Sequence, residues 1–471
     1  MKNMYDLLII GAGPGGYVAA KKAAKLGMSV AIIDKGPVGG TCINRGCIPT
    51  KAMLHAATRY RDIKECELFG LHVEGAGYDL QKIIEYKEAS TAEMRADLER
   101  EFEALGIVFV QGTARVQAGK RVRVEKEDGT SEFYFGRQIL IATGAKANRA
   151  DIPGADLPGV MTSEELLSSD ESKYKSLLIL GGGVIGLEIA TVFRDLGAEV
   201  TIIEISNRLL PTMDGEFSDA LEKILTDRGV HIYKESILEQ ISEADEGLKC
   251  RFVCQGETRE LQVEGVLMSV GRRPNTEGLF DANVPIKLER GRIVVDEFFR
   301  TNVPGIYAVG DVVGGIQLAH VASAEGTYVV EKMNDLKPSV IVSMVPSCLF
   351  TPISIVPSCL YTDPEIASVG LTEEQAREKG VPVRCGRYAM EGNGQTIISK
   401  EAVGFIKILF AKDSDVLLGA QMMCPRATDM IGELATALAN GLTSRQLMYA
   451  MRAHPTFNEA ISCAVENSRE A

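Results

Sequence analysis

The chain has 471 residues, of which 45% are hydrophobic. At about 100–200 residues per domain, this length suffices for about three domains and excludes a single small one. Its 51 lysines and arginines stand against 64 aspartates and glutamates, which gives a formal net charge of −13. Because such a surface repels phosphate backbones and anionic lipid, we expect neither nucleic acid nor a membrane as a partner.

Two uncharged stretches are long enough to be considered as a secretory signal or a membrane helix, but neither has the sequence features of one. The apolar stretch over residues 7–20 is interrupted by four glycines and a proline, so it does not resemble a secretory signal. The uncharged run over residues 338–362 contains four prolines, and we expect strand and loop there instead of a membrane helix. The ten cysteines are mostly scattered singly, which indicates a reducing compartment and predicts a cytoplasmic location.

Two stretches of the chain share the order strand, glycine turn, helix, strand. In both, the first glycine stands 23 residues before the acid that ends the second strand, from Gly11 to Asp34 and from Gly181 to Glu204. The pattern predicts two dinucleotide-binding units. The expected elements cover residues 7–11, 16–26 and 30–34 in the first unit and residues 177–181, 186–196 and 200–204 in the second.

Each glycine turn has the spacing Gly-x-Gly-x-x-Gly. The first glycine allows the tight turn, the second lets the backbone approach a pyrophosphate, and the third lets helix and strand pack closely. Each terminal acid is placed to hydrogen-bond a ribose, and Glu204 should repel a 2′-phosphate and so favour NAD over NADP. Arg208 could neutralise such a phosphate, but we expect it to be a solvated surface residue. The motif glycines are Gly11, Gly13 and Gly16 in the first unit and Gly181, Gly183 and Gly186 in the second.

The rest of the chain alternates between strand-like and helical patterns, which is typical of α/β and α+β architecture. One segment is duplicated: the sequence of residues 345–350 returns with little change at residues 356–361. We expect the first copy to be a loop insertion of about eleven residues. The other expected elements are a helix over 79–105, short strands over 107–135, a buried strand over 137–143, strands over 405–410 and 417–422, and helices over 431–440 and 444–451.

Cys42 and Cys47 lie five positions apart, directly after the acidic strand end of the first unit. Around a helical turn, two such sulfurs could close a small disulfide ring that stabilises little, which favours a redox pair. A helix N-terminus and Lys51 nearby would favour their thiolates. Two alternatives remain: half of a zinc site completed by Cys250 and Cys254, and two buried thiols without a role. The redox interpretation is preferred, and no metal site is expected.

His454 lies in a segment where Pro455 restricts the backbone and Glu459 is near enough in sequence to orient the imidazole. A histidine held by a carboxylate is a candidate general base. Asp311 follows an apolar strand and could face a cofactor; an aspartate that caps a turn is the alternative.

Together these residues resemble the flavin-dependent pyridine nucleotide-disulfide oxidoreductases, over essentially the whole chain. The most specific marks are residues 39–51, residues 142–144, residues 309–311 and His454-Pro-Thr456 with Glu459. The resemblance implies an α/β fold with two Rossmann-like domains and a C-terminal α+β dimerisation domain. The implied boundaries are 1–149 for the FAD-binding domain, 150–270 for the NAD-binding domain, 271–344 for the segment that completes the FAD domain, and 345–471 for the dimerisation domain.

The resemblance also implies roles for single residues. Cys47 is then the thiol against the flavin and Cys42 the thiol that exchanges with substrate. Lys51 and Glu188 form a pair near the flavin ring. The remaining implied FAD contacts are Asp34 at the ribose, Asp311 at the ribityl chain, and Thr143 with Gly144 at a strand end.

The branch of the family that matches best implies oxidation of dihydrolipoamide by NAD⁺, with FAD and NAD as cofactors. A homodimer with shared active sites, serving lipoyl domains of a 2-oxo-acid dehydrogenase or glycine cleavage complex, is the implied assembly. A related NAD(P)H-dependent disulfide reductase, or an NADH diaphorase or oxidase, is the alternative. The chain departs from the pattern at Arg452, where many members have a second histidine, and at the duplicated segment.

Overall fold

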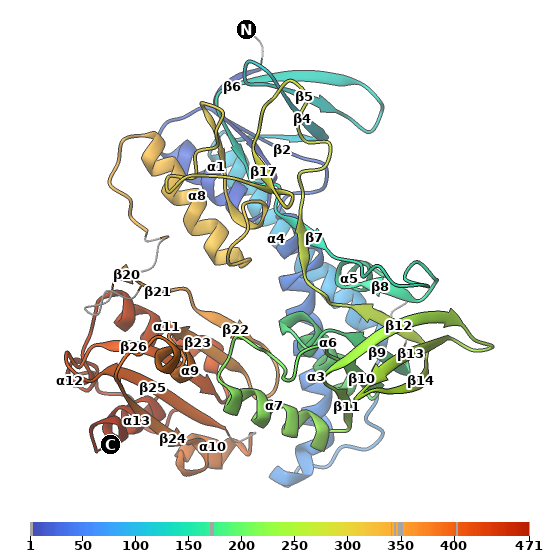
Figure 1. Ribbon diagram of the computed structural model, residues 1–471, viewed down its shortest axis with the longest axis vertical. Coiled ribbons are helices and arrows are strands. Elements are labelled where there is room, and N and C mark those ends of the chain that lie inside the picture. The colour runs from blue at the N-terminus through green and yellow to red at the C-terminus, as the bar shows by residue number, and fades with distance from the viewer. Residues whose placement is uncertain are drawn as a thin grey trace.

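The computed structural model describes residues 3–169, 174–340, 342, 345–346, 352–401 and 404–470. Its strands form three main sheets, which are the centres of three lobes (Figure 1). The sequence-based expectation of an α/β fold is confirmed. Within the described ranges, no helix is both long enough and apolar enough to cross a membrane.

The first sheet contains the N-terminal glycine turn. Its order is β3-β2-β1-β6-β5-β4, and β19 pairs with β6, so residues from the middle of the chain return to this sheet. β1 runs parallel to both β2 and β6, as a dinucleotide-binding unit requires. The strands are β1 (Met4–Ile10), β2 (Val30–Asp34), β3 (Val108–Gln111), β4 (Thr113–Gln117), β5 (Arg121–Glu125), β6 (Ser131–Ile141) and β19 (Ile306–Ala308).

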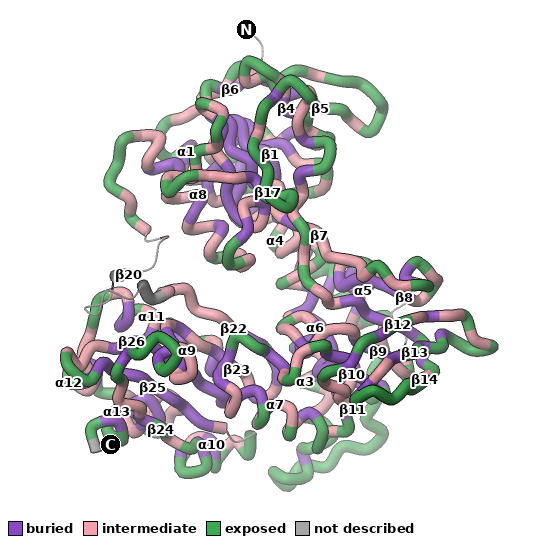
Figure 2. The backbone as a smooth tube through the Cα atoms, viewed as in Figure 1, coloured by how far each residue is buried: buried purple, intermediate pink, exposed green. Residues whose placement is uncertain are grey.

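Both faces of β1 are covered, because Leu7, Leu8 and Ile9 are all 0% exposed. Such two-sided burial explains the continuous apolar run of the sequence. In Figure 2 the centre of this lobe is correspondingly buried. Helices α1 (Pro14–Lys25) and α8 (Ala319–Met333) pack against each other beside the sheet.

Three helices connect β2 to β3 and position the cysteine segment. They are α2 (Gly40–Arg45), α3 (Cys47–Glu65), followed by a 3-10 turn at Cys66–Phe69, and α4 (Leu80–Ala104). The Asp79 carboxylate accepts a hydrogen bond from Lys82 N at 3.3 Å and caps α4, which confirms the helix expected over 79–105. α3 packs against α4 and also against α6 (Val184–Asp195) of the second lobe.

The second sheet repeats the parallel arrangement of the first, with the order β11-β10-β9-β15-β8. Its strands are β8 (Val160–Thr162), β9 (Ser176–Leu180), β10 (Glu199–Ile203), β11 (Val230–Tyr233) and β15 (Gly265–Met268). Its helices are α5 (Ser163–Ser168), α6 (Val184–Asp195) and α7 (Gly215–Asp227). A meander of β12 (Ser236–Glu243), β13 (Leu248–Cys254) and β14 (Glu257–Val263) packs beside it. β7 (Ala145–Ala147) pairs with β16 (Arg272–Pro274), and β17 (Leu288–Glu289) with β18 (Arg292–Ile293).

The C-terminal lobe is an antiparallel sheet of order β22-β23-β26-β25-β24 with helices packed against it. All seven residues of β25 and of β26 are buried, so these strands form its core. The strands are β22 (Ser358–Leu360), β23 (Ile366–Gly370), β24 (Val383–Ala389), β25 (Phe405–Ala411) and β26 (Leu417–Met423). The helices are α9 (Glu373–Glu378), α10 (Gly394–Ser399), α11 (Ala427–Ala439), α12 (Ser444–Leu447) and α13 (Glu459–Glu470).

The strands expected over 405–410 and 417–422 are confirmed, and the helix expected over 444–451 is half as long as predicted. The second copy of the duplicated segment contributes β22, which pairs with β23. Of the first copy, the backbone of β20 (Val345–Pro346) pairs with β21 (Pro352–Ile353). Residues 347–351 lie outside the described residues, so the expected loop insertion stays a prediction.

Candidate active site

The two glycine turns have the same steric pattern. A Cβ on Gly16 would lie 1.8 Å from the carbonyl oxygen of Gly11, and a Cβ on Gly186 would lie 2.2 Å from that of Gly181. The first glycines adopt φ values of 106° and 110°, which other residues rarely adopt. The first and third glycines are therefore required by the packing of strand, turn and helix.

The middle glycines differ, because their missing side chains leave open space. A Cβ on Gly13 would find its nearest neighbour at 3.8 Å, and one on Gly183 would meet nothing within 4 Å. Each lies at the N-terminal end of a helix, α1 and α6. Unpaired backbone N–H groups and an approachable backbone at that end form a cradle that fits a pyrophosphate.

The two acids at the strand ends hold these turns in equivalent ways. Asp34 accepts hydrogen bonds from Ala12 N at 2.7 Å and Gly36 N at 2.9 Å. Glu204 accepts from Gly182 N at 2.6 Å and Ser206 N at 2.7 Å. Each carboxylate thus braces the turn and stands beside it, where a ribose of a bound dinucleotide is expected.

The cysteine segment spans the break between α2 and α3, with Cys47 as the first residue of α3. Both cysteines are free thiols, and Cys42 donates a hydrogen bond to Cys47. That hydrogen bond, and then the charge of Lys51, hold the pKa of the Cys47 thiol at about 7. The same hydrogen bond and burial raise the pKa of Cys42 far above its ordinary value. The two thiols are therefore inequivalent: Cys47 ionises near neutral pH, and Cys42 keeps its proton.

Lys51 lies one helical turn beyond Cys47 on α3 and is paired across the lobes. Its Nζ lies 2.8 and 2.7 Å from the two carboxylate oxygens of Glu188 on α6. Tyr361 N donates to the same carboxylate at 3.1 Å, and the Tyr361 ring centre lies 4.5 Å from Lys51 Nζ. Side chains from all three lobes therefore meet beside the thiols.

The strand end at Thr143 and Gly144 is held by Asn275, which the sequence analysis missed. Thr143 Oγ1 donates to the Asn275 carbonyl at 2.8 Å, and Asn275 Nδ2 donates back to the Thr143 carbonyl at 3.0 Å. Asp311 follows β19, and its carboxylate lies 3.8 Å from Arg272 Nε. Burial raises the pKa of Asp311.

A second missed residue is Glu325 on α8, which is 9% exposed. Its carboxylate accepts a hydrogen bond from Gly310 N at 2.6 Å and so holds the loop that contains Asp311. Burial, and then the negative charge of Asp311, raise the pKa of Glu325 to about 7. In the sequence this residue is one more acid in an amphipathic helix, and no local pattern distinguishes it.

His454 and Glu459 lie together as a pair at the start of α13. His454 Nδ1 lies 2.9 Å from Glu459 Oε1, and Glu459 Oε2 accepts from Thr456 N at 2.9 Å. The hydrogen bond from Thr456 N, and then the one to His454, lower the pKa of Glu459. The His454 side chain is 78% exposed, so the imidazole is accessible from outside the subunit.

Arg452 lies beneath this pair and points into the protein. Its side chain is only 5% exposed, donates to Ser462 Oγ at 2.7 Å and contacts the carboxylate of Glu433. The other oxygen of Glu433 accepts from Asn458 Nδ2 at 3.3 Å. Arg452 therefore connects α11 and α13 with the segment that contains His454.

The histidine pair and the thiol pair are well separated within one chain. Figure 1 shows α13, which begins at Glu459, in the C-terminal lobe, whereas α3, which begins at Cys47, runs near the centre of the molecule beside α6. A single subunit therefore does not bring the candidate base to the candidate redox pair.

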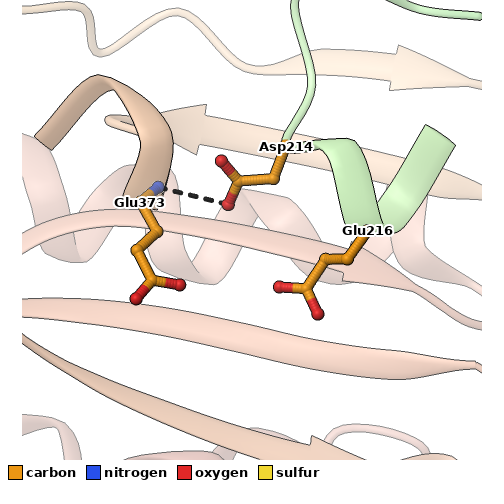
Figure 3. Close-up of side chains that lie close together, drawn as sticks. All are labelled: Asp214, Glu216 and Glu373. Atoms are coloured by element: carbon orange, nitrogen blue, oxygen red, sulfur yellow. Dashed lines mark hydrogen bonds between the residues drawn. The ribbon is translucent and has the colours of Figure 1, made fainter. Parts of the chain in front are cut away.

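One acidic cluster has the spacing of a cation site. The carboxylates of Asp214, Glu216 and Glu373 lie close together, and Glu373 N donates to Asp214 at 3.1 Å (Figure 3). Lys407 supplies the positive charge, because its Nζ contacts Glu216 and lies 3.0 Å from Asp214 and 2.6 Å from Glu373. A protein ammonium thus compensates these acids. Cys250 and Cys254 lie buried in β13 and belong to no metal-ligand cluster among the described residues.

The expectation that Arg208 is a solvated surface residue is wrong. Its guanidinium makes two hydrogen bonds to the Glu374 carboxylate, at 3.1 and 2.9 Å, and its side chain is 28% exposed. Glu374 lies on α9 of the C-terminal lobe, so a contact between two lobes holds the arginine.

This fold and this site define an oxidoreductase class with two dinucleotide-binding units and a cysteine pair. Residues 5–326 match the family model described as pyridine nucleotide-disulphide oxidoreductase, and residues 356–465 match the dimerisation domain of that family. The chain belongs to this family, whose domains bind FAD and a pyridine nucleotide; its dihydrolipoyl dehydrogenase members use FAD and NAD(H). The resemblance seen in the sequence is thereby confirmed, and the chain carries the family's dimerisation domain.

Individual proteins and solved structures are similar to the chain over nearly its whole length. The dihydrolipoyl dehydrogenase of Bacillus subtilis is 36% identical, over 98% of this chain and 97% of that protein. That of Geobacillus stearothermophilus is 34% identical, over 98% and 95%. Among solved structures, LpdA from Mycobacterium tuberculosis superposes with a TM-score of 0.89 at 26% identity, covering 99% of both chains. The copper(II) complex of RclA, an HOCl-induced flavoprotein disulfide reductase from Escherichia coli, gives 0.86 at 29%, covering 98% of this chain and 99% of that one.

Proposed function

We propose that this protein oxidises dihydrolipoamide with NAD⁺ through a redox disulfide between Cys42 and Cys47. The observation that supports it most directly is the inequivalence of the two thiols. Cys47, whose pKa is about 7, is suited to be the thiolate released when the disulfide opens, while Cys42 is suited to bond the substrate. The similarity to dihydrolipoyl dehydrogenases supports the substrate.

His454, Cys42 and Cys47 each have a different role in the oxidation of the dithiol. His454, with Nδ1 engaged by Glu459, accepts a proton from one substrate thiol at Nε2. The resulting thiolate attacks the Cys42 sulfur, the disulfide breaks, and Cys47 leaves as a thiolate beside Lys51. The second substrate thiol then attacks the substrate sulfur bonded to Cys42, which closes the lipoamide ring and breaks the bond to Cys42. The proton that this second thiol loses passes to the Cys42 sulfur, which returns as a thiol, and the first proton remains on His454. The substrate has lost two electrons and two protons, and the cysteine pair is reduced.

The open cradles at Gly13 and Gly183 fit two dinucleotides. We assign FAD to the first unit, with Gly11, Gly13, Gly16, Asp34, Thr143, Gly144 and Asp311 around it, and NAD to the second, with Gly181, Gly183, Gly186 and Glu204. When bound, FAD supplies the two-electron transfer between the reduced cysteine pair and NAD⁺. Lys51 and Glu188 hold a fixed charge pair beside the thiols.

The proposed assembly is a homodimer in which each active site combines the thiols of one subunit with His454 of the other. The exposure of His454 and its distance from α3 in one chain support this arrangement. The lipoyl domains of a multienzyme complex are the proposed macromolecular partners, and the free cysteines support a cytoplasmic location. We also propose the domain boundaries 1–149, 150–270, 271–344 and 345–471.

Anaerobic addition of dihydrolipoamide to the FAD-loaded enzyme tests the function. We expect the visible flavin spectrum to change in the wild type, and to stay unchanged in Cys42→Ser, which lacks the exchanging sulfur. Dithionite, which needs no cysteine, should reduce both proteins and serves as the control. A wild-type spectrum that responds to NADH and ignores dihydrolipoamide would favour a reductase of another disulfide or a diaphorase.

A further inference from the structure

The loop after Glu204 packs onto the second glycine turn. Leu210 N donates to the Gly182 carbonyl at 3.2 Å, and a Cβ on Gly182 would lie 2.4 Å from Leu209 Cδ2. This loop therefore lies beside the carboxylate to which we assign the nucleotide ribose. Arg208 is the first cationic side chain after that carboxylate in the sequence.

The guanidinium of Arg208 is already engaged by partners within the protein. Besides its two hydrogen bonds to Glu374, its Nη2 donates to the Pro211 carbonyl at 3.2 Å. Glu374 Oε1 also accepts from Gly215 N at 2.9 Å. A bidentate pair of this kind fixes the orientation of a guanidinium as well as offsetting its charge.

Glu374 is itself held in place by the contact between α9 and α7. Asp214, just before α7, accepts hydrogen bonds from Glu373 N at 3.1 Å and Glu374 N at 3.0 Å. Lys407 from β25 lies 3.0 Å from the same carboxylate. The C-terminal lobe thus presents Glu374 to Arg208 from a fixed backbone.

We infer that Glu374 is a specificity-determining residue for the nucleotide: by engaging Arg208 it removes the cation that could otherwise neutralise the 2′-phosphate of NADP. The inference rests on the assignment of Glu204 to the nucleotide ribose. Discrimination then has two parts. Glu204 opposes the phosphate directly, and Glu374, from another lobe, denies it a counter-charge.

The test measures dissociation constants of NAD⁺ and NADP⁺ by calorimetry on the FAD-loaded enzyme, so it does not depend on turnover. Glu374→Ala should improve NADP⁺ binding relative to NAD⁺ by about tenfold. Arg208→Ala alone should leave the ratio within about twofold, because that guanidinium is already engaged. The double variant Glu374→Ala with Arg208→Ala should lose the gain, since the freed cation is absent.

Two outcomes with Glu374→Ala would overturn the inference: an unchanged ratio in that single variant, or a gain that persists in the double variant. Reduced NADP⁺ binding in Arg208→Ala would also contradict it, because the arginine would then already serve the phosphate. Glu204→Gln separates the assumptions. If Glu204→Gln weakens the preference for NAD⁺ over NADP⁺ while Glu374→Ala does not, the assignment of Glu204 to the ribose is supported and the role of Glu374 is contradicted. If neither variant weakens that preference, both assignments are contradicted. Glu374→Gln, which keeps the volume, replaces Glu374→Ala if that variant loses FAD.

Discussion

Lys51 Nζ bridges both carboxylate oxygens of Glu188, at 2.8 and 2.7 Å, although the two residues lie on different lobes. Glu188 is 3% exposed, and Tyr361 N also donates to it. Lys51 is 33% exposed, so the buried member of the pair is Glu188, and removing Lys51 leaves that carboxylate without its cation. An uncompensated buried charge typically costs about 3–5 kcal/mol. The pair therefore holds the two lobes together beside the thiols. Its two charges have opposite effects on Cys47, because Lys51 lowers the pKa of that thiol and Glu188 raises it.

The first prediction concerns Lys51→Met in the reduced enzyme. Because the Lys51 charge lowers the pKa of Cys47, its loss should raise that pKa above the wild-type value of about 7. Thiolates, and not thiols, react with iodoacetamide, so alkylation at pH 7 should slow roughly threefold and its pH profile should move to higher pH. An unchanged profile would show that the hydrogen bond from Cys42 alone determines the ionisation.

The second prediction concerns Glu188→Gln, the matched control, for which we expect the pKa of Cys47 to change in the opposite direction. The negative charge of Glu188 raises the pKa of Cys47, so its removal should move the alkylation profile to lower pH. Mass spectrometry of the modified protein should locate the label on Cys47 in each case, because the pKa of Cys42 is far above this range. Labelling of Cys42 first would contradict the assigned inequivalence.

The glycine turns and their strands were predictable because their spacing leaves few alternatives. Gly11 and Gly16 must lie where backbone atoms touch, and the acid that braces each turn follows at a fixed distance in the sequence. The cysteine pair and His454 with Glu459 were likewise visible, since each is local. Local patterns also indicated α4, whose cap at Asp79 is a recognisable signal.

What the sequence did not reveal depends on contacts between distant residues. α8 begins at Ala319 after Leu318, whose side chain makes no capping hydrogen bond, so the sequence holds no start signal. Asp214 precedes α7, and its carboxylate bonds the first N–H groups of α9 instead. The pairing of Arg208 with Glu374 spans 166 positions and has no local signature.

The third prediction contrasts two alanine substitutions in the first glycine turn. Gly16→Ala places a Cβ 1.8 Å from the Gly11 carbonyl oxygen and should destabilise the fold by about 2 kcal/mol or more. Gly13→Ala meets no protein atom closer than 3.8 Å, so the fold should persist while FAD is lost. Thermal unfolding and the ratio of flavin to protein separate the two effects. Retention of full FAD content in Gly13→Ala would contradict the assignment of the FAD pyrophosphate to this turn.

The fourth prediction concerns Arg452→Met, which removes a guanidinium that is only 5% exposed and leaves the partly exposed Glu433 without its cation. The segment that positions His454 should loosen, and turnover with dihydrolipoamide should fall about tenfold. Reduction of an artificial dye by NADH, which does not need the base, should change less than twofold. Arg452→Lys should recover part of the activity because it restores the charge. An equal loss in both reactions would indicate general damage to the fold instead.

The final prediction concerns which subunit supplies the base. In a heterodimer of Cys47→Ser and His454→Ala subunits, a shared site places both defects in one site and leaves the other intact. If the base acted within its own subunit, each site would contain one defect. Co-expression with two different affinity tags allows the heterodimer to be purified, and each variant homodimer serves as an inactive control.

With independent sites, the purified heterodimer should show about half of wild-type dihydrolipoamide turnover, and a random 1:1 mixture about a quarter. The expectation follows from the structure, because His454 is 78% exposed and α13 lies far from α3 in one chain. Flavin content measured in parallel ensures that both sites hold FAD. Inactivity of heterodimers with full flavin content would contradict the shared site, and would require a rearrangement that brings α13 to α3 within one subunit.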